Sequence, residues 1–428
     1  MRHLASRRAR PLAPILACIA TAALLAVSAV ASAQPMSRQE ARQRAEALAA
    51  LGQALFADPR LSASGRLACA SCHSPDHAFG PPNALAVQAG GADMRRPGLR
   101  AAPSLRYLQS VPQFTEHLFE SEDEADESVD NGPSGGLTWD GRVDTAQAQA
   151  RIPLLSPFEM GNRGPGEAVA RALAAGHGPA LAAIYGADVL GDREAVFQAL
   201  LEAFEAYQQD WRTFYPYSSK YDLYLAGRAT LTHQEARGLG LFEDPAKGNC
   251  ASCHVSERAA DGTPPRFTDY GMAALGVPRN PEIPANADPA YHDLGLCGPL
   301  RTDFGARAAY CGLFRTPSLR NVATRHAFFH NGVLHSLRDA VAFYATRDTD
   351  PARWYPKRPD GSVALYNDLP LPYQANLHRG PPFGGEPGGK AALTDEEVDA
   401  IVAFLRTLTD GWRAEETEAA KAQPTVNR

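Results

Sequence analysis

Apolar residues recur at helical spacing in three well-separated segments of the chain. In residues 38–56 and 192–211 the apolar side chains repeat with the helical period, so each segment can present one apolar face. A third segment opens with Thr394 and Glu397, the two residues of a capping box, and continues with an apolar stripe. Strand signals are few and short, and the pattern therefore predicts a mainly α fold.

One sequence unit occurs twice in the chain. Residues 51–59 and 239–245 carry the same Leu, Gly, Phe and Asp-Pro signals, and each run is followed by a short loop and by Cys-Ala-Ser-Cys-His. A single duplication of this kind indicates two domains of one type rather than a long array of repeats. The boundary between them is expected near residues 212–230.

The repeated pentapeptide carries the chemistry. Cys-x-x-Cys-His is the attachment signature of c-type haem, because two neighbouring thiols can each add to a haem vinyl group while the histidine reaches the iron. The six residues are Cys69, Cys72, His73, Cys250, Cys253 and His254. A zinc site would need further Cys or His partners at short spacing, and a redox pair has no need of the histidine. We therefore expect one covalent haem c in each of two tandem cytochrome-c-like domains, residues 34–215 and 216–412.

Two long segments between the predicted helices are rich in proline and glycine. They cover residues 74–137 and 346–392, and the whole chain holds 34 Pro and 36 Gly. Loops of this length are usually functional when they are ordered. We expect them to wrap the haem edges and to hold the two domains together.

The N-terminus has the layout of an export signal. Arginines precede an apolar stretch over residues 12–30, and residues 31–33 (Ala-Ser-Ala) fit a cleavage site. We expect residues 1–33 to be a signal peptide and the mature protein to be periplasmic, where c-type haem is assembled. An uncleaved anchor, or a lipoprotein attached at Cys18, is the alternative. No later stretch reaches the roughly 18 apolar residues of a membrane span, and residues 413–428 are expected to form a polar tail.

Two cysteines lie outside the signal and the haem motifs. Cys297 and Cys311 are separated by a short loop with glycine and proline, so a disulfide can close, and an oxidising compartment favours it. Two free thiols are the alternative. The formal net charge of −6 gives no support for binding to nucleic acid or to an anionic membrane.

Four further runs accompany the two haem motifs. They are Trp139-Asp140-Gly141-Arg142, Pro157-Phe158-Glu159-Met160-Gly161, Thr316-Pro317-Ser318-Leu319-Arg320-Asn321 and Phe328-Phe329-His330-Asn331-Gly332. With them the chain resembles the bacterial di-haem cytochrome c peroxidase family, and more closely its MauG-like branch, whose members use peroxide to oxidise residues of a partner protein. The resemblance implies that hydrogen peroxide is reduced at the N-terminal haem and that electrons reach it through the second haem from a protein partner.

The resemblance makes His73 the proximal ligand of the peroxidatic haem. Many peroxidases of the family place a removable histidine ligand in the loop after the first haem motif, at a position that is Ala89 here. The only histidine in residues 74–100 is His77, which is too close in sequence to swing easily to the opposite face of the ring. We expect an iron whose sixth position is permanently open, as in MauG-like members.

The resemblance also assigns a distal pocket and a relay. Glu159 matches the family's distal glutamate, a carboxylate that can move a proton between the two peroxide oxygens as general acid and base. Gln149 and Pro153 match other distal-pocket residues. Trp139 matches the tryptophan between the two haems, whose indole can relay charge by one-electron oxidation. A packed core tryptophan in a tight turn is the alternative, and both can hold.

The sixth ligand of the second haem, whose proximal ligand would be His254, separates the two branches. The plain peroxidases have a methionine at a position that is Tyr344 here. Leu337, Val341 and Tyr344 share one face of a predicted helix, and periodicity alone would make Tyr344 a core residue. A methionine thioether raises the reduction potential, whereas an anionic tyrosinate favours high-valent iron. Tyr344 as ligand, together with Ala89, favours the MauG-like branch.

The family also binds a calcium ion between its domains, and calcium prefers oxygen ligands such as backbone carbonyls. Arg325 and Ala327 match the positions whose carbonyls serve. We therefore expect a calcium ion from the resemblance. The sequence departs from the family at one ligand, because the asparagine usually found before Pro103 is Ala101 here.

Two functions of different class fit these residues. A peroxide-dependent oxidoreductase would take electrons from a small cytochrome or copper protein, or would modify residues of a secreted partner in the MauG-like manner. A non-enzymatic di-haem electron carrier is the alternative, and it would need six-coordinate iron at both sites. The absence of a histidine at Ala89, and the presence of Glu159 and Gln149, argue for the enzyme.

Overall fold

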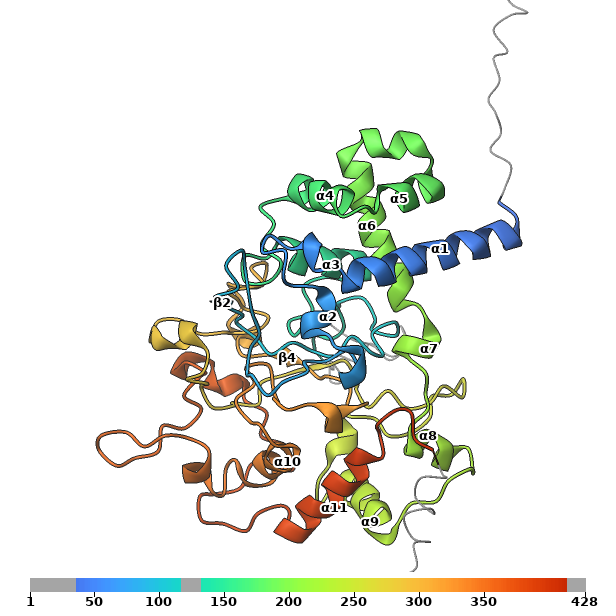
Figure 1. Ribbon diagram of the computed structural model, residues 1–428. Coiled ribbons are helices and arrows are strands. Elements are labelled where there is room, and N and C mark those ends of the chain that lie inside the picture. Colours follow the sequence, from blue (N-terminus) through green and yellow to red (C-terminus); the bar gives the residue numbers. More distant parts are fainter. Residues whose placement is uncertain (1–35, 117–131, 414–428) are drawn as a thin grey trace, which may run out of the picture. The chain divides into compact units, whose positions relative to one another are not determined.

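The computed structural model describes residues 36–116 and 132–413 (Figure 1). The expected signal peptide and nearly all of the expected polar tail lie outside the described residues. By its internal contacts the chain divides into a unit ending at Arg44 and a unit from Ala45 to Arg428. The first unit is described only as the start of helix α1, and the second holds every site discussed below.

The described chain is largely helical, and most of the helices are short. The α-helices are α1 (Arg38–Ala57), α2 (Cys69–Cys72), α3 (Ala146–Leu155), α4 (Pro165–Ala174), α5 (Gly178–Tyr185), α6 (Arg193–Gln208), α7 (Trp211–Phe214), α8 (Lys220–Leu225), α9 (His233–Glu243), α10 (Leu337–Thr346) and α11 (Asp395–Arg406). Single turns of 3₁₀-helix and irregular loops connect them.

The three helices predicted from periodicity are present. Helix α1 covers the first predicted segment, and α6 covers most of the second before the chain turns into α7. At the start of α11, Thr394 Oγ1 accepts a hydrogen bond from Glu397 N (3.3 Å), and Glu397 Oε2 accepts one from Thr394 N (3.0 Å). This reciprocal pair is the predicted capping box, and it satisfies two backbone donors that a helix start otherwise leaves free.

Strands are few and short among the described residues, as predicted. Strand β1 (Ala89–Gly90) pairs antiparallel with β2 (Arg96–Pro97), and β3 (Met272–Ala273) pairs antiparallel with β4 (Phe314–Arg315). The first hairpin lies in the long loop that follows the first haem motif. The second pair joins the loop after the second haem motif to the segment that leads into Thr316.

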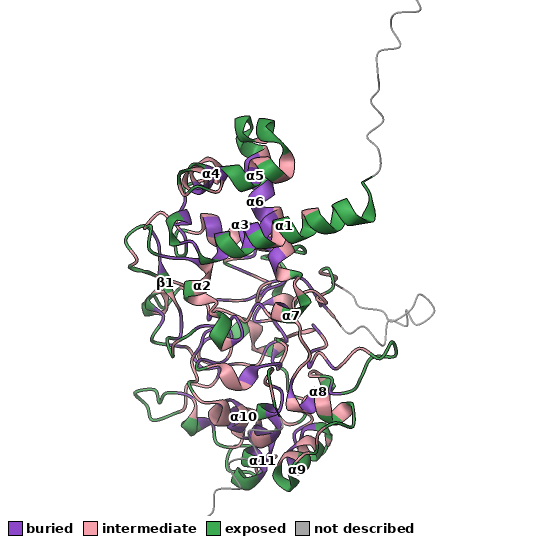
Figure 2. Cartoon of the chain, turned by 45° about the vertical axis from the view of Figure 1, so that its right-hand side comes forward, coloured by how far each residue is buried: buried purple, intermediate pink, exposed green. Residues whose placement is uncertain are grey.

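The buried apolar side chains form separate clusters that follow the duplication. One cluster draws only on residues 51–214 and centres on α6. A second draws on residues 221–408 and centres on α10 and α11, and a third lies beside α10 between residues 277 and 383. Figure 2 shows the buried residues along α6 and α11.

Each half contains a close helix crossing made by one glycine. A Cβ atom on Gly52 of α1 would clash with the carbonyl oxygen of Ala203 in α6, and one on Gly238 of α9 would clash with that of Ala400 in α11. Gly240, in contrast, has open space around its Cα. The structural counterpart of Gly52 is therefore Gly238, and the two crossings place a helix of each half directly before its Cys-x-x-Cys-His motif.

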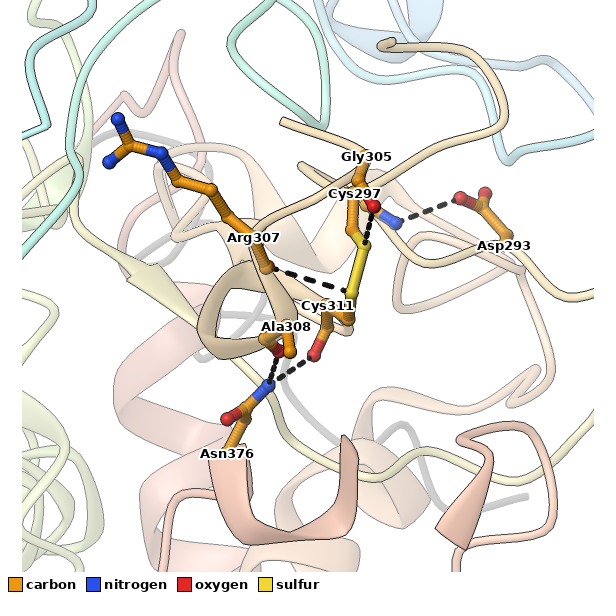
Figure 3. Close-up of a disulfide and its surroundings, with 8 residues drawn as sticks. Asp293, Cys297, Gly305, Arg307, Ala308, Cys311 and Asn376 are labelled. Carbon is orange, nitrogen blue, oxygen red and sulfur yellow. Dashed lines mark hydrogen bonds between the residues drawn. A yellow bond between two sulfur atoms is a disulfide. The ribbon is translucent and has the colours of Figure 1, made fainter. Parts of the chain in front are cut away.

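Cys297 and Cys311 form a disulfide, the pairing favoured over two free thiols (Figure 3). Their Cα atoms lie 4.7 Å apart. Asn376 Nδ2 donates to the carbonyls of Cys311 (3.0 Å) and Ala308 (2.7 Å), so the bonded loop is also tied to the long C-terminal loop. The disulfide thus restrains the loop that leads to β4.

Candidate active site

The first Cys-x-x-Cys-His motif places two thiols and one imidazole together. Cys69 and Cys72 begin and end α2, so their side chains lie one turn apart on one face. The His73 N–H donates to Cys69 O (2.9 Å), and His73 Nδ1 lies 3.0 Å from the carbonyl oxygen of Phe79. Because a carbonyl can only accept, Nδ1 carries the ring proton and the Nε2 lone pair is left to bind a metal.

The second motif repeats this arrangement. The His254 N–H donates to Cys250 O (2.8 Å), and His254 Nδ1 lies 2.9 Å from the carbonyl oxygen of Phe267. Phe79 and Phe267 both have positive φ, 56° and 54°, which is a rare conformation for an aromatic residue. In both halves this turn aims the carbonyl at the histidine, and that hydrogen bond fixes the orientation of the imidazole ring.

A tetrapeptide that occurs twice in the sequence supports both carbonyls. Pro-Ser-Leu-Arg occurs at residues 103–106 and 317–320. The backbone N–H of Leu105 donates to Phe79 O (3.2 Å), and that of Leu319 donates to Phe267 O (3.3 Å). Ser104 Oγ donates to the carbonyl of Ala78 (2.5 Å), and Ser318 Oγ donates to the carbonyl of Arg266 (2.7 Å). Its repetition was a signal that could have located the residues behind both histidines.

The thiols do not resemble those of a redox pair. Burial raises the pKa of Cys69, Cys72 and Cys250 to about 12, whereas a redox-active Cys-x-x-Cys has a thiol with a lowered pKa. Among the described residues, no group of three or more His, Cys, Asp or Glu side chains gathers in a way that could hold a metal ion on its own. The zinc and redox alternatives therefore find no support in this geometry.

A deep cavity adjoins the second motif. Its lining includes Cys250, Cys253, His254, Tyr344, Trp139, Tyr107, Phe329, Arg315 and Arg325. Tyr344 lies on α10, and its ring packs against Phe383 (5.3 Å between centroids) and Phe329 (6.1 Å). Burial raises the pKa of the Tyr344 phenol, and the nearby Cys250 and Cys253 add to that rise. The structure thus brings Tyr344 to the second pair of thiols, as the predicted helix face requires.

Glu159 lies beside the first pair of thiols. Its side chain is exposed to solvent, and enough protein atoms surround its carboxyl group to shift its pKa. Burial raises the pKa of Glu159, while Arg142 and a hydrogen bond from Ser156 act to lower it. Its charge in turn raises the pKa of Cys69 and Cys72, so the carboxyl group stands close to both.

The hairpin β1–β2 packs against the backbone of Glu159. The Gly91 N–H donates to Glu159 O (2.7 Å), and a Cβ atom on Gly90 would overlap the carbonyl oxygens of Phe158 and Glu159. Ala89 stands at the start of β1, and it offers no ligand atom. His77 lies in a 3₁₀ turn with its Nδ1 3.3 Å from Ser74 Oγ, a contact within its own loop.

Gln149 and Pro153 stand one turn apart on α3, so they share a face of that helix. The carbonyl of Pro153 accepts a hydrogen bond from Met160 N (3.0 Å), which ties α3 to the turn that carries Glu159. The three residues assigned to a distal pocket by resemblance are thus on α3 and the turn directly after it. The structure records no direct hydrogen bond between the Gln149 and Glu159 side chains.

Trp139 is fixed between residues of both halves. Its Nε1–H donates to Ala101 O (2.8 Å), and its own carbonyl accepts from Arg315 N (2.8 Å). The next residue, Asp140, is fully buried and pairs with Arg100 (2.8 Å), which also pairs with Asp293. The indole therefore lies on the wall of the cavity with its N–H committed.

The charges on the cavity wall match what a haem would bring. Among the described residues, neither Arg315 nor Arg325 forms an ion pair with a carboxylate. Each donates to a backbone carbonyl, Thr138 O (3.1 Å) or Ala102 O (3.2 Å). Burial lowers the pKa of both to about 10, so both stay charged at neutral pH. A haem carries two propionate carboxylates, and a buried cation such as Arg315 favours such a partner. With the paired thiols and oriented histidines, these residues fit haem.

The residues expected to hold calcium fit that ion poorly. Ala101 has no side-chain oxygen, and its own carbonyl already accepts from Trp139. The position is flanked by the Arg325 guanidinium, which reaches the neighbouring Ala102 carbonyl. A calcium ion needs six to eight oxygen ligands, and a cation next to it opposes binding. Calcium therefore has no part in the function proposed below.

Comparison with known proteins agrees with this geometry. The sequence profile of the family described as di-haem cytochrome c peroxidase matches residues 46–230. The methylamine utilization protein MauG of Paracoccus denitrificans is 34% identical over 418 residues, which cover 92% of this chain and 95% of that protein. The chain belongs to the di-haem cytochrome c peroxidase family. As a member, it is a peroxidase-type oxidoreductase with two c-type haems as its cofactors.

Solved structures of this family show the same fold. The di-haem peroxidase BthA from Burkholderia thailandensis is 43% identical, with a TM-score of 0.74 over 85% of this chain and 86% of that chain. A MauG-like protein associated with microbial copper homeostasis is 28% identical, with a TM-score of 0.59 over 85% of this chain and 90% of that chain. Within the described residues of this family member, no helix has the length and apolar content to cross a membrane.

Proposed function

We propose that the chain is a periplasmic peroxidase with two cytochrome-c-like domains, residues 34–215 and 216–412. One haem is joined to Cys69 and Cys72 with His73 as its proximal ligand, and the other is joined to the second motif. The separate apolar clusters and the repeated support of the two histidines favour this division. Hydrogen peroxide is reduced at the N-terminal haem.

The observation that carries this proposal is the position of Glu159. The charge of its carboxyl group raises the pKa of both thiols of the first motif and is not among the causes that shift those of the second. Reduction of hydrogen peroxide consumes two protons and two electrons and yields two water molecules. Bound haem supplies the iron that takes up peroxide and delivers the electrons. Glu159 accepts the proton from one peroxide oxygen and donates it to the other, as general base and then general acid.

Gln149 and Pro153 complete the distal side in this proposal. Their shared face on α3 borders the turn that carries Glu159, and the Pro153 carbonyl holds that turn through Met160. A carboxylate that must exchange a proton at a fixed place gains from a rigid support, because misplacement is costly to proton transfer. Gln149 acts as a polar neighbour that orients peroxide.

Tyr344 and His254 would both hold the iron of the second haem, with Tyr344 as its sixth ligand. The cavity position supports this, because Tyr344 lines the wall that Cys250, Cys253 and His254 also line. Burial raises the pKa of the phenol, so the proton leaves only when a cation replaces it. A ferric iron provides that charge. Trp139, anchored to Ala101 and Arg315, relays electrons between the two haems.

The second haem receives electrons from a protein partner, which is a small cytochrome or copper protein or a secreted protein that is itself oxidised. Tyr344, and Ala89 in place of a removable histidine, favour the MauG-like mode. The solved relatives include a variant of BthA with a tyrosine in the sequence replaced by methionine, which shows that the change is tolerated by that protein's fold. An electron carrier would have no use for Glu159 at this position.

The test is electron paramagnetic resonance of the ferric holoprotein before and after one equivalent of peroxide. We expect one axial high-spin signal and one low-spin signal without methionine-type features, and both should disappear when peroxide is added. Glu159→Gln should leave the starting spectrum unchanged and slow the disappearance. Two low-spin signals that peroxide does not alter would refute the peroxidase and leave the electron carrier.

A further inference from the structure

Arg325 brings a guanidinium from the C-terminal half to the loop behind the N-terminal haem. Its Nη1 donates to Ala102 O (3.2 Å) and lies 4.0 Å from the place of a Cβ on Gly80. Gly80 follows Phe79, whose carbonyl orients His73, and the charge of Arg325 reaches the His73 ring. One side chain therefore links the segment after Asn321 to both loops that surround the first proximal histidine.

This guanidinium has no carboxylate partner among the residues that the structure describes. Its recorded hydrogen bond goes to a backbone carbonyl, and part of its surface faces the cavity. A buried charge without a counter-ion is costly, so the polar groups that it contacts must stabilise it.

The residues around this charge include those expected to hold calcium. The carbonyls of Arg325 and Ala327 were the expected ligands, and the third was a side-chain oxygen at position 101. Ala101 offers none, while Arg325 itself sends its side chain to the adjoining carbonyl of Ala102. A planar guanidinium presents five N–H donors and binds carbonyl oxygens directly. Its hydrogen bond to the Ala102 carbonyl therefore brings a positive charge next to the position that was expected to supply the third ligand.

We propose that the Arg325 guanidinium is the resident cation of this junction and takes the place of a calcium ion. It ties the loop before Pro103 to the segment that carries Arg325 and Ala327, and it keeps a positive charge behind His73. This inference goes beyond the proposed peroxidase function, because the metal content of the protein and the role of Arg325 in it do not depend on turnover.

The first experiment measures calcium in the full holoprotein by plasma mass spectrometry, after dialysis against EGTA and after dialysis against calcium chloride. We expect less than one calcium per chain in both samples, and identical paramagnetic resonance spectra of the ferric haems. One calcium per chain after calcium dialysis, together with a high-spin signal that changes when EGTA removes it, would overturn the proposal.

Variants separate the charge from the packing. Arg325→Met keeps the length and loses the charge, so we expect a changed high-spin signal of the N-terminal haem and a lower melting temperature. Arg325→Lys keeps the charge and should retain most of the wild-type spectrum. Arg338→Met, which removes an exposed arginine of α10 paired with Asp395 and Asp399, is the matched control and should change neither.

A swap gives the decisive result even if Arg325→Met folds poorly. The double variant Ala101→Asn with Arg325→Ala restores a side-chain oxygen, keeps the carbonyl at position 325 and removes the guanidinium. We expect it to bind calcium chloride in calorimetry and to recover the wild-type spectrum only when calcium is present. If Arg325→Met has the wild-type spectrum and stability, or if the double variant ignores calcium, the guanidinium is not the cation of this junction.

Discussion

Two acids lie beside the two pairs of thiols, and the surrounding protein raises the pKa of both. At Glu159 the raised pKa moves proton exchange upward from the range of an ordinary carboxyl group, which suits an acid–base residue. At Tyr344 the same effect holds the phenol neutral until a metal displaces its proton. One physical cause therefore supports two different roles, and the partner that each acid meets decides which role it takes.

Replacing Glu159 by glutamine should lower peroxide turnover by about 10²–10⁴-fold, the usual contribution of a positioned acid–base group. Because the deprotonated form accepts the first proton, wild-type activity should fall as the pH drops through the raised pKa of Glu159. The acid limb should thus lie above the pKa of an ordinary glutamate. Stopped-flow rates across pH test this, and an unchanged acid limb in Glu159→Gln would assign the titration to another group.

Replacing Tyr344 by methionine should raise the reduction potential of the second haem. A tyrosinate stabilises ferric iron, whereas a thioether favours the ferrous state. Spectroelectrochemical titration of the two haems measures this, and the N-terminal haem serves as the internal control because its potential should change little. A second haem with an unaltered potential would mean that Tyr344 is not bound to the iron.

At the level of elements, the duplicated feature is a helix crossing at a glycine. Gly52 lets α1 approach α6, and Gly238 lets α9 approach α11, so that the chain leaves each crossing directly toward a haem motif. A glycine inside a helix costs roughly 0.5–1 kcal/mol relative to alanine. The close approach offsets this cost by bringing Phe242 of α9 against Phe404 of α11, with 5.2 Å between ring centroids.

Two glycines of α9, which are two residues apart, give a matched comparison. Gly238→Ala should lower the free energy of unfolding by about 1–3 kcal/mol or more, because the added methyl meets the Ala400 carbonyl and the crossing cannot open without loss of packing. Gly240→Ala has open space around it and should raise stability by about 0.5–1 kcal/mol. Denaturant titration of the two variants distinguishes them, and equal effects would contradict the crossing.

At the scale of the whole chain, one buried carboxylate joins the two halves. Asp410 accepts hydrogen bonds from Arg106 (2.9 Å) and Tyr107 (2.8 Å) of the first half, and from Asn321 (2.7 Å) and Ser218 N (3.2 Å) of the second. Its side chain is 3% exposed, so solvent cannot replace these partners easily. The hydrogen bonds of Asp410 therefore join the two halves, in addition to the contacts around Trp139.

Asp410→Ala should lower the free energy of unfolding by about 3 kcal/mol, because it leaves Arg106 and Tyr107 without their acceptor. It should also make the two halves unfold in separate steps, which calorimetry resolves. Asp399→Ala, which removes an exposed ion pair with Arg338, is the control and should cost no more than about 1 kcal/mol. A single transition at the wild-type temperature would show that the two halves unfold together without the hydrogen bonds of Asp410.

The sequence was most informative where a pattern is local. Periodicity located α1, α6 and α11, and the family resemblance drew attention to Tyr344, which lines the cavity beside the second motif. The features that the sequence did not predict depend on how segments far apart in the chain come together. Gly238 could not be told from Gly240 without knowing which one faces α11. The direction of the Arg325 side chain was equally hidden, because a backbone assignment to calcium says nothing of where the guanidinium goes.

The two histidine supports differ in one respect that bears on folding. His73 finds its carbonyl six residues along the chain, whereas His254 finds its own thirteen residues along. The entropy of loop closure grows with the logarithm of length, which amounts to about 0.7 kcal/mol between these two cases. The N-terminal proximal turn should therefore order first, and hydrogen exchange of Phe79 and Phe267 during refolding would show that sequence. The two copies of the duplicated unit are therefore expected to fold one after the other.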